Sequence, residues 1–545
     1  AFSGHHFALQ GAREFVDKHF DEIGHKIKLL VNLDLSMEKD ALVALWIGYF
    51  YQYDLDPGRF IWISQRISND YMPQLYQLNK NYSGKFINAM DIGSWRRYIP
   101  FITLDSEPFT VSGGLGFSFV TAMASKKYLN TPFDNLKNLN IENVKPQADI
   151  ALWIIYNLAN EDQLPECYAT RFNPQGGGFP TLRGRVVTYN FEKGWYDSVP
   201  HALVYLEGGP ETLIYNHKIV LITDENGEFE FKGCLQSIVR GGGVYVTRYY
   251  TMCAYVDDPS PSPVEYATDL GKYGAPMYPG KIIIDKSDNF ATIAVFECGS
   301  IALFGCLDPF SLEPILPTFE VMEIETYSIP DQWGATSDQG IALIFVPTNV
   351  SVQISMKKFG DNQPIALLRN INSDDPSTAS GYKVSSRGEC LALYNTPLFF
   401  TIDGMYQLTT FRLNISTTRG LHSLNVKKIQ SKVSESLNAA ISALKNKRYD
   451  VFYTEAFNAW SLEVQAYREV KSLMQDAINT TIFFFILLIP FSFLFQKLIF
   501  DFMEGSKQLI ATSMILAIFI AILYFVHPGF HLTSNIYMTL TGLVV

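Results

Sequence analysis

The stretch TTIFFFILLIPFSFLFQKLIF, Thr480–Phe500, carries no charged residue before Lys497. As a helix, an apolar run of this length spans the roughly 30 Å hydrocarbon core of a bilayer. A second apolar run, Leu509–Val526, follows a short polar turn, and a third begins at Ile536. We therefore predict transmembrane helices in residues 480–545, two complete and the third truncated. A buried helical hairpin of a soluble protein is the alternative.

The segment that precedes these runs predicts a helical stalk over residues 422–478. No glycine or proline occurs in Val426–Thr480, and apolar residues recur there at helical spacing. We expect two antiparallel helices that break near Lys447–Tyr449. The second helix can continue into the first membrane span without a linker, so the stalk would transmit displacement between an external domain and the membrane.

Composition and charge narrow the possible partners and the location. The chain has 545 residues and a net charge of −11, with no basic stripe, which argues against nucleic acid as a partner. We expect membrane lipid to be a partner, in the cell membrane, with the bulk of the chain extracytoplasmic. Asn-x-Ser/Thr sequons on that external part predict glycosylation at Asn81, Asn349 and Asn414.

The cysteines and the two ends of the chain add smaller expectations. Six cysteines are scattered without a CxxC pair, which disfavours a zinc ribbon or a thioredoxin motif. Cys234–Cys253 and Cys298–Cys306 are the pairs nearest in sequence, and buried free thiols are the equal alternative. The chain begins without Met and ends inside an apolar run, so we expect both ends to be cut.

The remaining sequence predicts a multidomain fold with an α/β domain in residues 1–165 and two β-sandwiches in residues 180–256 and 257–418. In the first part, a buried strand over Lys26–Ser36 and an apolar helical stripe over Ile141–Glu161 indicate the α/β layout. Beyond it, short alternating strands are separated by Gly, Pro, Asn and Asp turns. Within the second sandwich, YQLTTFRLNIS (Tyr406–Ser416) is interpreted as a strand.

The first segment resembles the co-catalytic dizinc aminopeptidases, a clan that also contains the non-enzymatic transferrin receptor ectodomain. FSGHHFALQGAREFV (Phe2–Val16) is similar to the family's "F-x-G-E-E-x-G-L-x-G-S-x-x-F" element. VNLDLS (Val31–Ser36), DSEPF (Asp105–Phe109) and YLNTPFDNL (Tyr128–Leu136) resemble its zinc-binding strand, its "D-H-x-P-F" element and its "Y-H-T-P-x-D-T" element. The resemblance covers about 160 residues, the C-terminal half of such a domain.

The departures from the family pattern predict a non-catalytic domain. The position of the family's general base is His5, that of the adjacent zinc ligand is His6, and that of a ligating histidine is Asn130, while Asp34 is retained. Catalytic zinc needs about three protein ligands. We therefore expect no catalytic residue and no cofactor, with zinc only if the chain is an active peptidase. Asp105, Glu107 and Asp134 are expected to cap turns.

Two further resemblances concern the middle and the end of the chain. Leu182–Gly233 resembles the carboxypeptidase regulatory-like, transthyretin-like sandwich through its "T-D-x-x-G-x-F-x-F" hairpin, in which Asp224, Asn226 and Gly227 form the turn. The helical pair, the spans and HPGFH (His527–His531) resemble FtsX-like permease proteins. That resemblance implies an ABC-type ATPase as a possible partner.

These observations lead to one principal hypothesis and two alternatives. The principal one is a non-catalytic, membrane-anchored binding or scaffold protein whose ectodomain is coupled by the stalk to a permease-type membrane domain. The first alternative is a membrane-bound zinc metallopeptidase whose remaining ligands lie outside this chain. The second is a structural or complex-associated subunit of the cell envelope, whose partners would be other membrane or envelope proteins.

Overall fold

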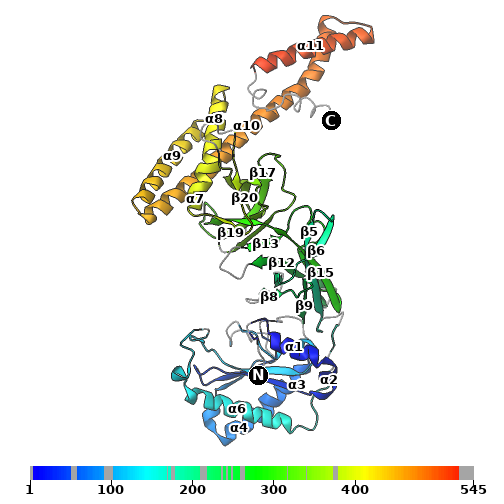
Figure 1. The fold of residues 1–545 in the computed structure, drawn as a ribbon, viewed down its shortest axis with the longest axis vertical. Helices are drawn as coiled ribbons and strands as arrows, with labels where there is room; N and C mark the ends of the chain where they lie inside the picture. The colour runs from blue at the N-terminus through cyan, green and yellow to red at the C-terminus, as the bar shows by residue number, and fades with distance from the viewer. Residues whose placement is uncertain are drawn as a thin grey trace. The chain divides into compact units, whose positions relative to one another are not determined.

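The computed structural model describes residues 4–5, 7–48, 50, 58–90, 98, 102–129, 131–167, 170–172, 178–208, 218–234, 237–240, 244–246, 249–257, 264–315, 317–338, 340–371 and 378–526. The chain divides into two compact units (Figure 1). The first contains Ala1–Ser260 and Tyr266–Phe296, and the second contains Pro261–Glu265 and Glu297–Val545. His6, Asn130 and the third apolar run from Ile536 lie outside the described residues.

The first unit begins with an α/β domain built on a mixed four-stranded sheet. Its strand order is β1-β4-β2-β3, with β1 parallel to β4, β4 antiparallel to β2, and β2 parallel to β3. The strands are β1 (Leu30–Asp34), β4 (Gly116–Thr121), β2 (Leu42–Leu45) and β3 (Phe86–Asn88). The strand expected over Lys26–Ser36 is thus shorter and lies at the sheet edge, where its side chains are half-buried rather than fully buried.

Both faces of this sheet are apolar, because successive side chains of its central strand β2 point to opposite faces. Apolar faces must be covered by other parts of the fold. Leu42 and Ala44 of β2 enter one core, and Val43 and Leu45 enter another. The helix expected over Ile141–Glu161 is present as α6 (Ile141–Ala159) and packs on the first core. The other helices are α1 (Gln10–Lys18), α2 (Phe20–Lys26), α3 (Gly58–Arg66), the π-helix η1 (Ile67–Tyr71), α4 (Met72–Leu78), η2 (Lys80–Tyr82), α5 (Glu107–Val111) and η4 (Leu136–Asn138).

A nine-stranded sheet follows the α/β domain. Its order is β6-β5-β15-β13-β12-β7-β8, with β14 on β12 and β9 on β5. Its strands are β5 (Thr181–Asn190), β6 (Trp195–Ser198), β7 (Leu203–Gly208), β8 (Lys218–Ile222), β9 (Glu228–Lys232), β12 (Tyr249–Asp257), β13 (Val264–Thr268), β14 (Lys281–Ile283) and β15 (Asp288–Glu297). Two further short strands, β10 (Ile238–Arg240) and β11 (Val244–Val246), pair with each other.

Strand β15 lies within residues 257–418, the predicted second sandwich, but it pairs in parallel with β5 of the first sheet. Its alternation fits either sheet, because alternation identifies a strand and not its neighbour.

The turn before β9 has the predicted chemistry. Asp224 accepts hydrogen bonds from the backbone N–H groups of Asn226 and Glu228 at 2.9 and 2.8 Å, and Gly227 has φ 77°. Phe229 and Phe231 are both buried. The predicted hairpin ladder is absent from the described strands, since β8 pairs with β7 while β9 pairs with β5.

Replacing Gly227 tests how strongly this turn is constrained. A Cβ at Gly227 would lie 2.9 Å from the backbone nitrogen of Val199, whereas a Cβ at Gly194 would meet nothing within 4 Å, although Gly194 also has positive φ. We expect Gly227→Ala to lower the free energy of unfolding by about 2 kcal/mol or more and Gly194→Ala by about 1 kcal/mol. Denaturant unfolding of both variants measures the difference, and equal losses would contradict the close contact.

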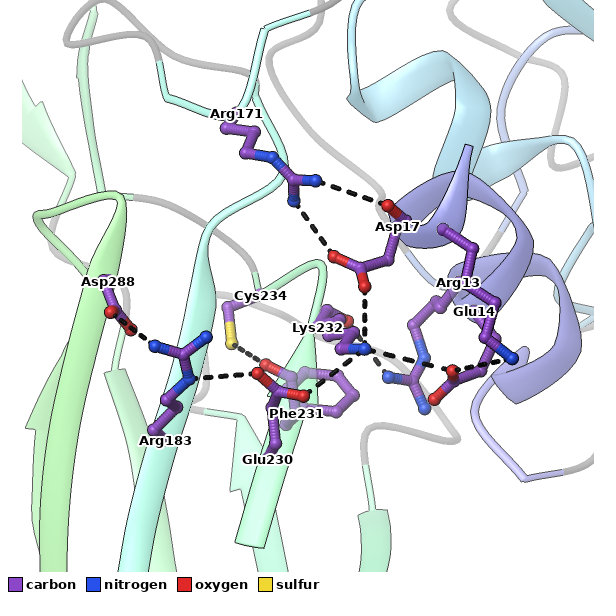
Figure 2. A network of polar contacts seen from close by, with 11 residues as sticks. Arg13, Glu14, Asp17, Arg171, Arg183, Glu230, Phe231, Lys232, Cys234 and Asp288 are labelled. Atoms are coloured by element: carbon purple, nitrogen blue, oxygen red, sulfur yellow. Dashed lines mark hydrogen bonds and ion pairs between the residues drawn. The ribbon is translucent and has the colours of Figure 1, made fainter. Parts of the chain in front are cut away.

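A polar network joins α1 of the α/β domain to β9 of the sheet (Figure 2). The Lys232 ammonium lies 2.7 Å from Asp17 and 3.3 Å from Glu230, and the Arg171 guanidinium lies 3.0 Å from Asp17. The Arg13 guanidinium donates to the Lys232 carbonyl at 3.0 Å. Beneath this network one apolar cluster contains side chains of both parts, so the α/β domain and the sheet share a core.

Asp17 makes this junction sensitive to acid. Burial raises the pKa of Asp17, but hydrogen bonds from Lys232 and Arg171 outweigh it, and the pKa lies below its ordinary value. The ion pairs therefore stabilise the fold above the ordinary pKa of 3.8, and this stabilisation is lost as the pH falls through the lower folded pKa. We expect Asp17→Asn to lower the free energy of unfolding at neutral pH by roughly 1 kcal/mol after solvent screening.

The control for this change is Asp197→Asn, which breaks an exposed pair with Lys193. We expect that variant to unfold like the parent at neutral pH. Denaturant unfolding at neutral and acid pH makes the comparison, and an Asp17→Asn loss that persists unchanged under acid would contradict the assignment.

The second unit contains two four-stranded sheets around one core. Their orders are β18-β19-β16-β23 and β17-β20-β21, with β22 on β20. The strands are β16 (Gly299–Phe304), β17 (Pro317–Glu323), β18 (Gly334–Asp338), β19 (Ile341–Val346), β20 (Ser351–Lys358), β21 (Pro364–Leu368), β22 (Tyr382–Lys383) and β23 (Cys390–Leu393).

A long helix closes the core of this sandwich. Trp460, which is fully buried, packs there and donates its indole N–H to the Ile365 carbonyl at 2.7 Å. The helices of the second unit are α7 (Thr396–Phe399), the π-helix η6 (Phe400–Tyr406), α8 (Gln407–Thr418), α9 (Leu424–Lys445), α10 (Tyr449–Ile499) and α11 (Gly505–Val526). The predicted break near Lys447–Tyr449 is present between α9 and α10.

The strand expected over Tyr406–Ser416 is wrong, because the residues after Tyr406 form α8. The threonines and the isoleucine of this segment favour a strand locally. However, Thr409, Leu413 and Ser416 are buried at intervals of three and four residues, which is the spacing of one helix face. Packing of that face near α10 overrides the local preference.

Helix α10 runs for 51 residues without interruption and includes Pro490. Its C-terminal part and α11 are long and apolar enough to cross a membrane, by length and composition. Large apolar side chains on both helices are exposed, among them Phe483 at 59%, Leu494 at 63% and Ile510 at 61%.

None of the six cysteines, all within the described residues, forms a disulfide. Three of them, Cys234, Cys298 and Cys306, are buried. Of the two alternatives that the sequence left open, the structure therefore has the one without disulfides.

Candidate functional site

A cleft of about 540 Å³ lies at the edge of the α/β sheet where the parallel strands β1 and β4 end. Parallel strands bring their carboxyl ends to one edge of a sheet, which is where ligands bind in open α/β folds. The cleft is lined by the segment after β1, the segment after β4 and the loop that leads to α6. These segments contain residues of two of the four stretches that resemble the aminopeptidase motifs, Val31–Ser36 and Tyr128–Leu136.

Hydrogen bonds hold the segment after β1 in place. The fully buried Gln147 of α6 donates its amide N–H groups to the carbonyls of Ser36 and Lys39 at 3.0 and 2.7 Å. The Thr121 hydroxyl accepts the backbone N–H of Ser36 at 2.6 Å. Glu38 accepts from the Ser125 hydroxyl at 2.6 Å and ties the two walls of the cleft together. The site is thereby preorganised.

Asp34, which the sequence analysis named as a possible zinc ligand, forms an ion pair with Lys126. The Lys126 ammonium lies 3.2 Å from Asp34 Oδ1, and the lysine side chain is only 10% exposed. Asp34 Oδ2 is buried and has no hydrogen-bond partner among the described residues. Lys126 adopts φ 47°, a left-handed conformation that positions it beside the strand end. The lysine therefore supplies the positive charge that balances Asp34.

His5, which lies at the position of the family's general base, forms a hydrogen bond with Asp105. Its Nδ1 lies 3.0 Å from Asp105 Oδ1, and its Nε2 lies 3.4 Å from the Thr103 hydroxyl. The hydrogen bond to Asp105 raises the pKa of His5 against the lowering effect of burial. The charges of Asp34 and Lys126 also act on this imidazole. Thus His5, Asp105, Asp34 and Lys126 form one cluster of two acids and two bases.

The fates of the other predicted site residues differ. His6 and Asn130 fall outside the described residues, so the full predicted ligand set stays a prediction. Within the described part of the chain, no group of three His, Cys, Asp or Glu side chains could hold a metal ion. Of the expected turn caps, Glu107 is buried and accepts backbone N–H groups from Leu104 and Phe50 at 2.7 and 3.0 Å.

The three predicted glycosylation sites are exposed asparagines in different settings. Asn81 lies in the short helix η2, Asn349 lies in the turn between β19 and β20 with φ 65°, and Asn414 lies on α8. The serine of the third sequon, Ser416, is fully buried. Modification at these positions stays a prediction.

Sequence reasoning missed Lys126 and Gln147. Lys126 lies just before the segment that resembles the Thr-Pro element, and its charge in an otherwise apolar and small-residue stretch, VTAMASKKYL, was the available signal. Gln147 interrupts the apolar stripe of α6, which is the sequence signal of a buried polar group with a fixed partner.

Titration of His5 should appear in the stability of the unit. A histidine whose folded pKa is raised stabilises the fold below its unfolded value of 6.5, and this stabilisation is lost as the pH rises through the folded pKa. We expect Asp105→Asn to cost roughly 1 kcal/mol at about pH 6 and much less at about pH 9. Asp134→Asn, at an exposed position, is the control. A pH-independent loss would contradict the pairing.

No family model matches the chain, and no curated protein matches it. Among solved structures, the shaft pilin spaA from Lactobacillus rhamnosus GG matches at 7% identity and a TM-score of 0.15, covering 39% of this chain and 96% of that chain. A putative adhesin from Bacteroides ovatus matches at 9% identity and 0.15, covering 40% and 89%. The fimbrial anchor protein Mfa2 from Porphyromonas gingivalis matches at 7% and 0.12, covering 35% and 81%. Similarities at these TM-scores carry no argument about function.

Proposed function

We propose that the chain is a membrane-anchored extracytoplasmic binding protein without catalytic activity. Its cleft at the ends of β1 and β4 takes a polar ligand, and its stalk couples the external part to a membrane domain of the FtsX-like permease type. The observation that carries this proposal is the continuity of α10. One helix is packed in the core of a sandwich at its beginning and is apolar and exposed at its end.

The exposed half of α10 supports the membrane anchor. Apolar side chains cover it on several sides, and a helix that is apolar all round is stable only inside a core or in lipid. The helix α11 has the same character and packs against α10. A hairpin of this kind satisfies its backbone groups internally, as a lipid environment requires.

The ion pair in the cleft supports the absence of catalysis. A zinc ion at Asp34 would bring a second positive charge close to the Lys126 ammonium and would remove the lysine's partner. Activation of water for hydrolysis needs both the metal and a nearby base. The base position holds His5, whose pKa is raised by the hydrogen bond to Asp105, and a raised pKa favours the protonated imidazolium, the form that cannot accept a proton.

The coupling part of the proposal rests on the length of α10. A rigid helix transmits displacement along its axis, so a movement of the sandwich reaches the first membrane span directly. A permease-type membrane domain would work with a separate ABC-type ATPase, because the sequence contains no G-x-x-x-x-G-K-[ST] motif of its own.

Metal analysis of the purified, detergent-solubilised chain tests the function, with Lys126→Met and Lys127→Met as matched variants. We expect less than stoichiometric zinc and no aminopeptidase turnover in the parent and in both variants. Only Lys126→Met should destabilise the fold, because it leaves Asp34 without its cation. Stoichiometric zinc with turnover in the parent would overturn the proposal in favour of a metallopeptidase.

Co-purification separates the two non-catalytic roles. Affinity purification from membranes should recover an ATPase if the stalk couples to a permease-type domain. Recovery of envelope structural proteins without an ATPase would overturn the coupling and favour a structural subunit.

A further inference from the structure

A buried carboxyl lies where three helices of the second unit meet. Glu463 of α10 is fully buried, and its Oε2 accepts a hydrogen bond from the Gln430 amide of α9 at 2.7 Å. The hydroxyl of Thr409, on α8, also acts on this carboxyl. Oε1 has no hydrogen-bond partner among the described residues. The carboxyl therefore lies between an apolar cluster around Trp460 and another around Val433.

No cation balances this carboxyl within the described part of the chain. The pKa of Glu463 is shifted by burial and by the side chains of Thr409 and Gln430, neither of which carries a charge. The charged side chains on the elements packed against α10 make contacts with groups other than Glu463. Arg412 of α8 lies over the Tyr467 ring at 5.4 Å, and Asp403 of η6 accepts from the Tyr382 hydroxyl.

The remaining charges on the packed helices are also directed elsewhere. On α9, Lys427, Lys428, Lys432 and Glu435 are exposed. On α10 itself, Glu469 accepts from the Asn425 amide at 2.8 Å, and Arg468 pairs with Asp361 at 3.0 Å. Helix α7 and strand β21, which also contact α10, contain no charged residue. The site is thus neutral only when Glu463 carries a proton.

Burial raises the pKa of Glu463 from 4.5 to about 8, against the smaller lowering effects of Thr409 and Gln430. Between these two values the folded state binds a proton that the unfolded state has released. Stability therefore falls as the pH rises from 4.5 to about 8 and then levels off. Ionisation inside the fold demands water or rearrangement, because a buried carboxylate without a cation is strongly disfavoured.

The helix most easily displaced is α8. Its buried face includes two hydroxyls, those of Thr409 and Ser416, and Ser416 Oγ has no hydrogen-bond partner among the described residues. Apolar burial on α8 comes mainly from Leu408 and Leu413. By contrast, α9 and α10 meet along an extended apolar seam. Weak packing and an unmatched polar face are the features of an element that opens locally.

We propose that Glu463 is a proton-controlled latch, which holds α8 against the α9–α10 pair while its carboxyl is neutral and releases α8 when the carboxyl ionises. Release lets water reach the carboxylate and the unmatched hydroxyls of α8. Because Glu463 and the first apolar span belong to the same helix, about 25 Å apart at 1.5 Å per residue, the latch acts on the part of α10 that enters the span.

Hydrogen exchange of the full chain in detergent, read by mass spectrometry over the peptides of α8, tests the latch. Glu463→Gln imitates the neutral carboxyl at every pH. At about pH 4 we expect α8 to exchange equally in the parent and in Glu463→Gln. At about pH 9.5 the parent should exchange at least roughly tenfold faster than the variant, because the released carboxyl ionises above pH 4.5 while the packed carboxyl keeps its proton up to about pH 8.

Two further variants keep the test decisive. Glu435→Gln removes an exposed glutamate from α9 and should behave like the parent at both pH values. Thr409→Val removes a hydroxyl that lowers the pKa of the packed carboxyl, so the increase of α8 exchange with pH should continue to higher pH before it levels off. Equal exchange of α8 in the parent and in Glu463→Gln at high pH would overturn the latch. A parent that already differs from Glu463→Gln at about pH 4 would overturn it as well.

Discussion

The second unit depends on one constraint, that a single helix serves two environments. The first half of α10 buries Phe452, Ala456, Trp460 and Val464 between the sandwich and α9. Its second half exposes apolar side chains from Ile482 onward. No glycine or proline interrupts the helix before Pro490, so the change of environment occurs without a hinge. The sandwich therefore holds one end of a helix whose other end exposes an apolar surface.

Two buried or half-buried carboxyl groups of the chain, Asp34 and Glu463, have very different neighbours. Asp34 is half-buried and has the Lys126 ammonium beside it, whereas Glu463 is fully buried and accepts a hydrogen bond from the neutral Gln430 amide. A cation stabilises the ionised form, and neutral hydrogen bonds do not overcome desolvation. Burial without a cation raises the pKa of Glu463 to about 8, so this acid keeps its proton at neutral pH in the packed stalk, whereas Asp34 has a charged neighbour.

Much of the fold follows from the sequence where the signal is local and long. The stripe of α6, the turn at Asp224, the break between α9 and α10 and the apolar terminal helices were all predicted. Each depends on periodicity or turn chemistry within one segment. The pairing of β15 with β5 and the helix α8 were missed, since both are decided by distant neighbours. Strand alternation does not specify a partner, and β-branched residues adopt a helix when its face packs.

The candidate site was predicted only in outline. The motifs included Asp34 and His5, and the cleft lies beside Asp34, but Lys126 lies outside the motifs and Asp105 was expected to cap a turn. A family motif conserves the backbone that positions a side chain, while the chemistry depends on what stands opposite that side chain. Retention of Asp34 is therefore weak evidence for zinc, because a carboxylate binds an ammonium as readily as a metal. The residue that decides between these two states is Lys126, and it lies outside every motif.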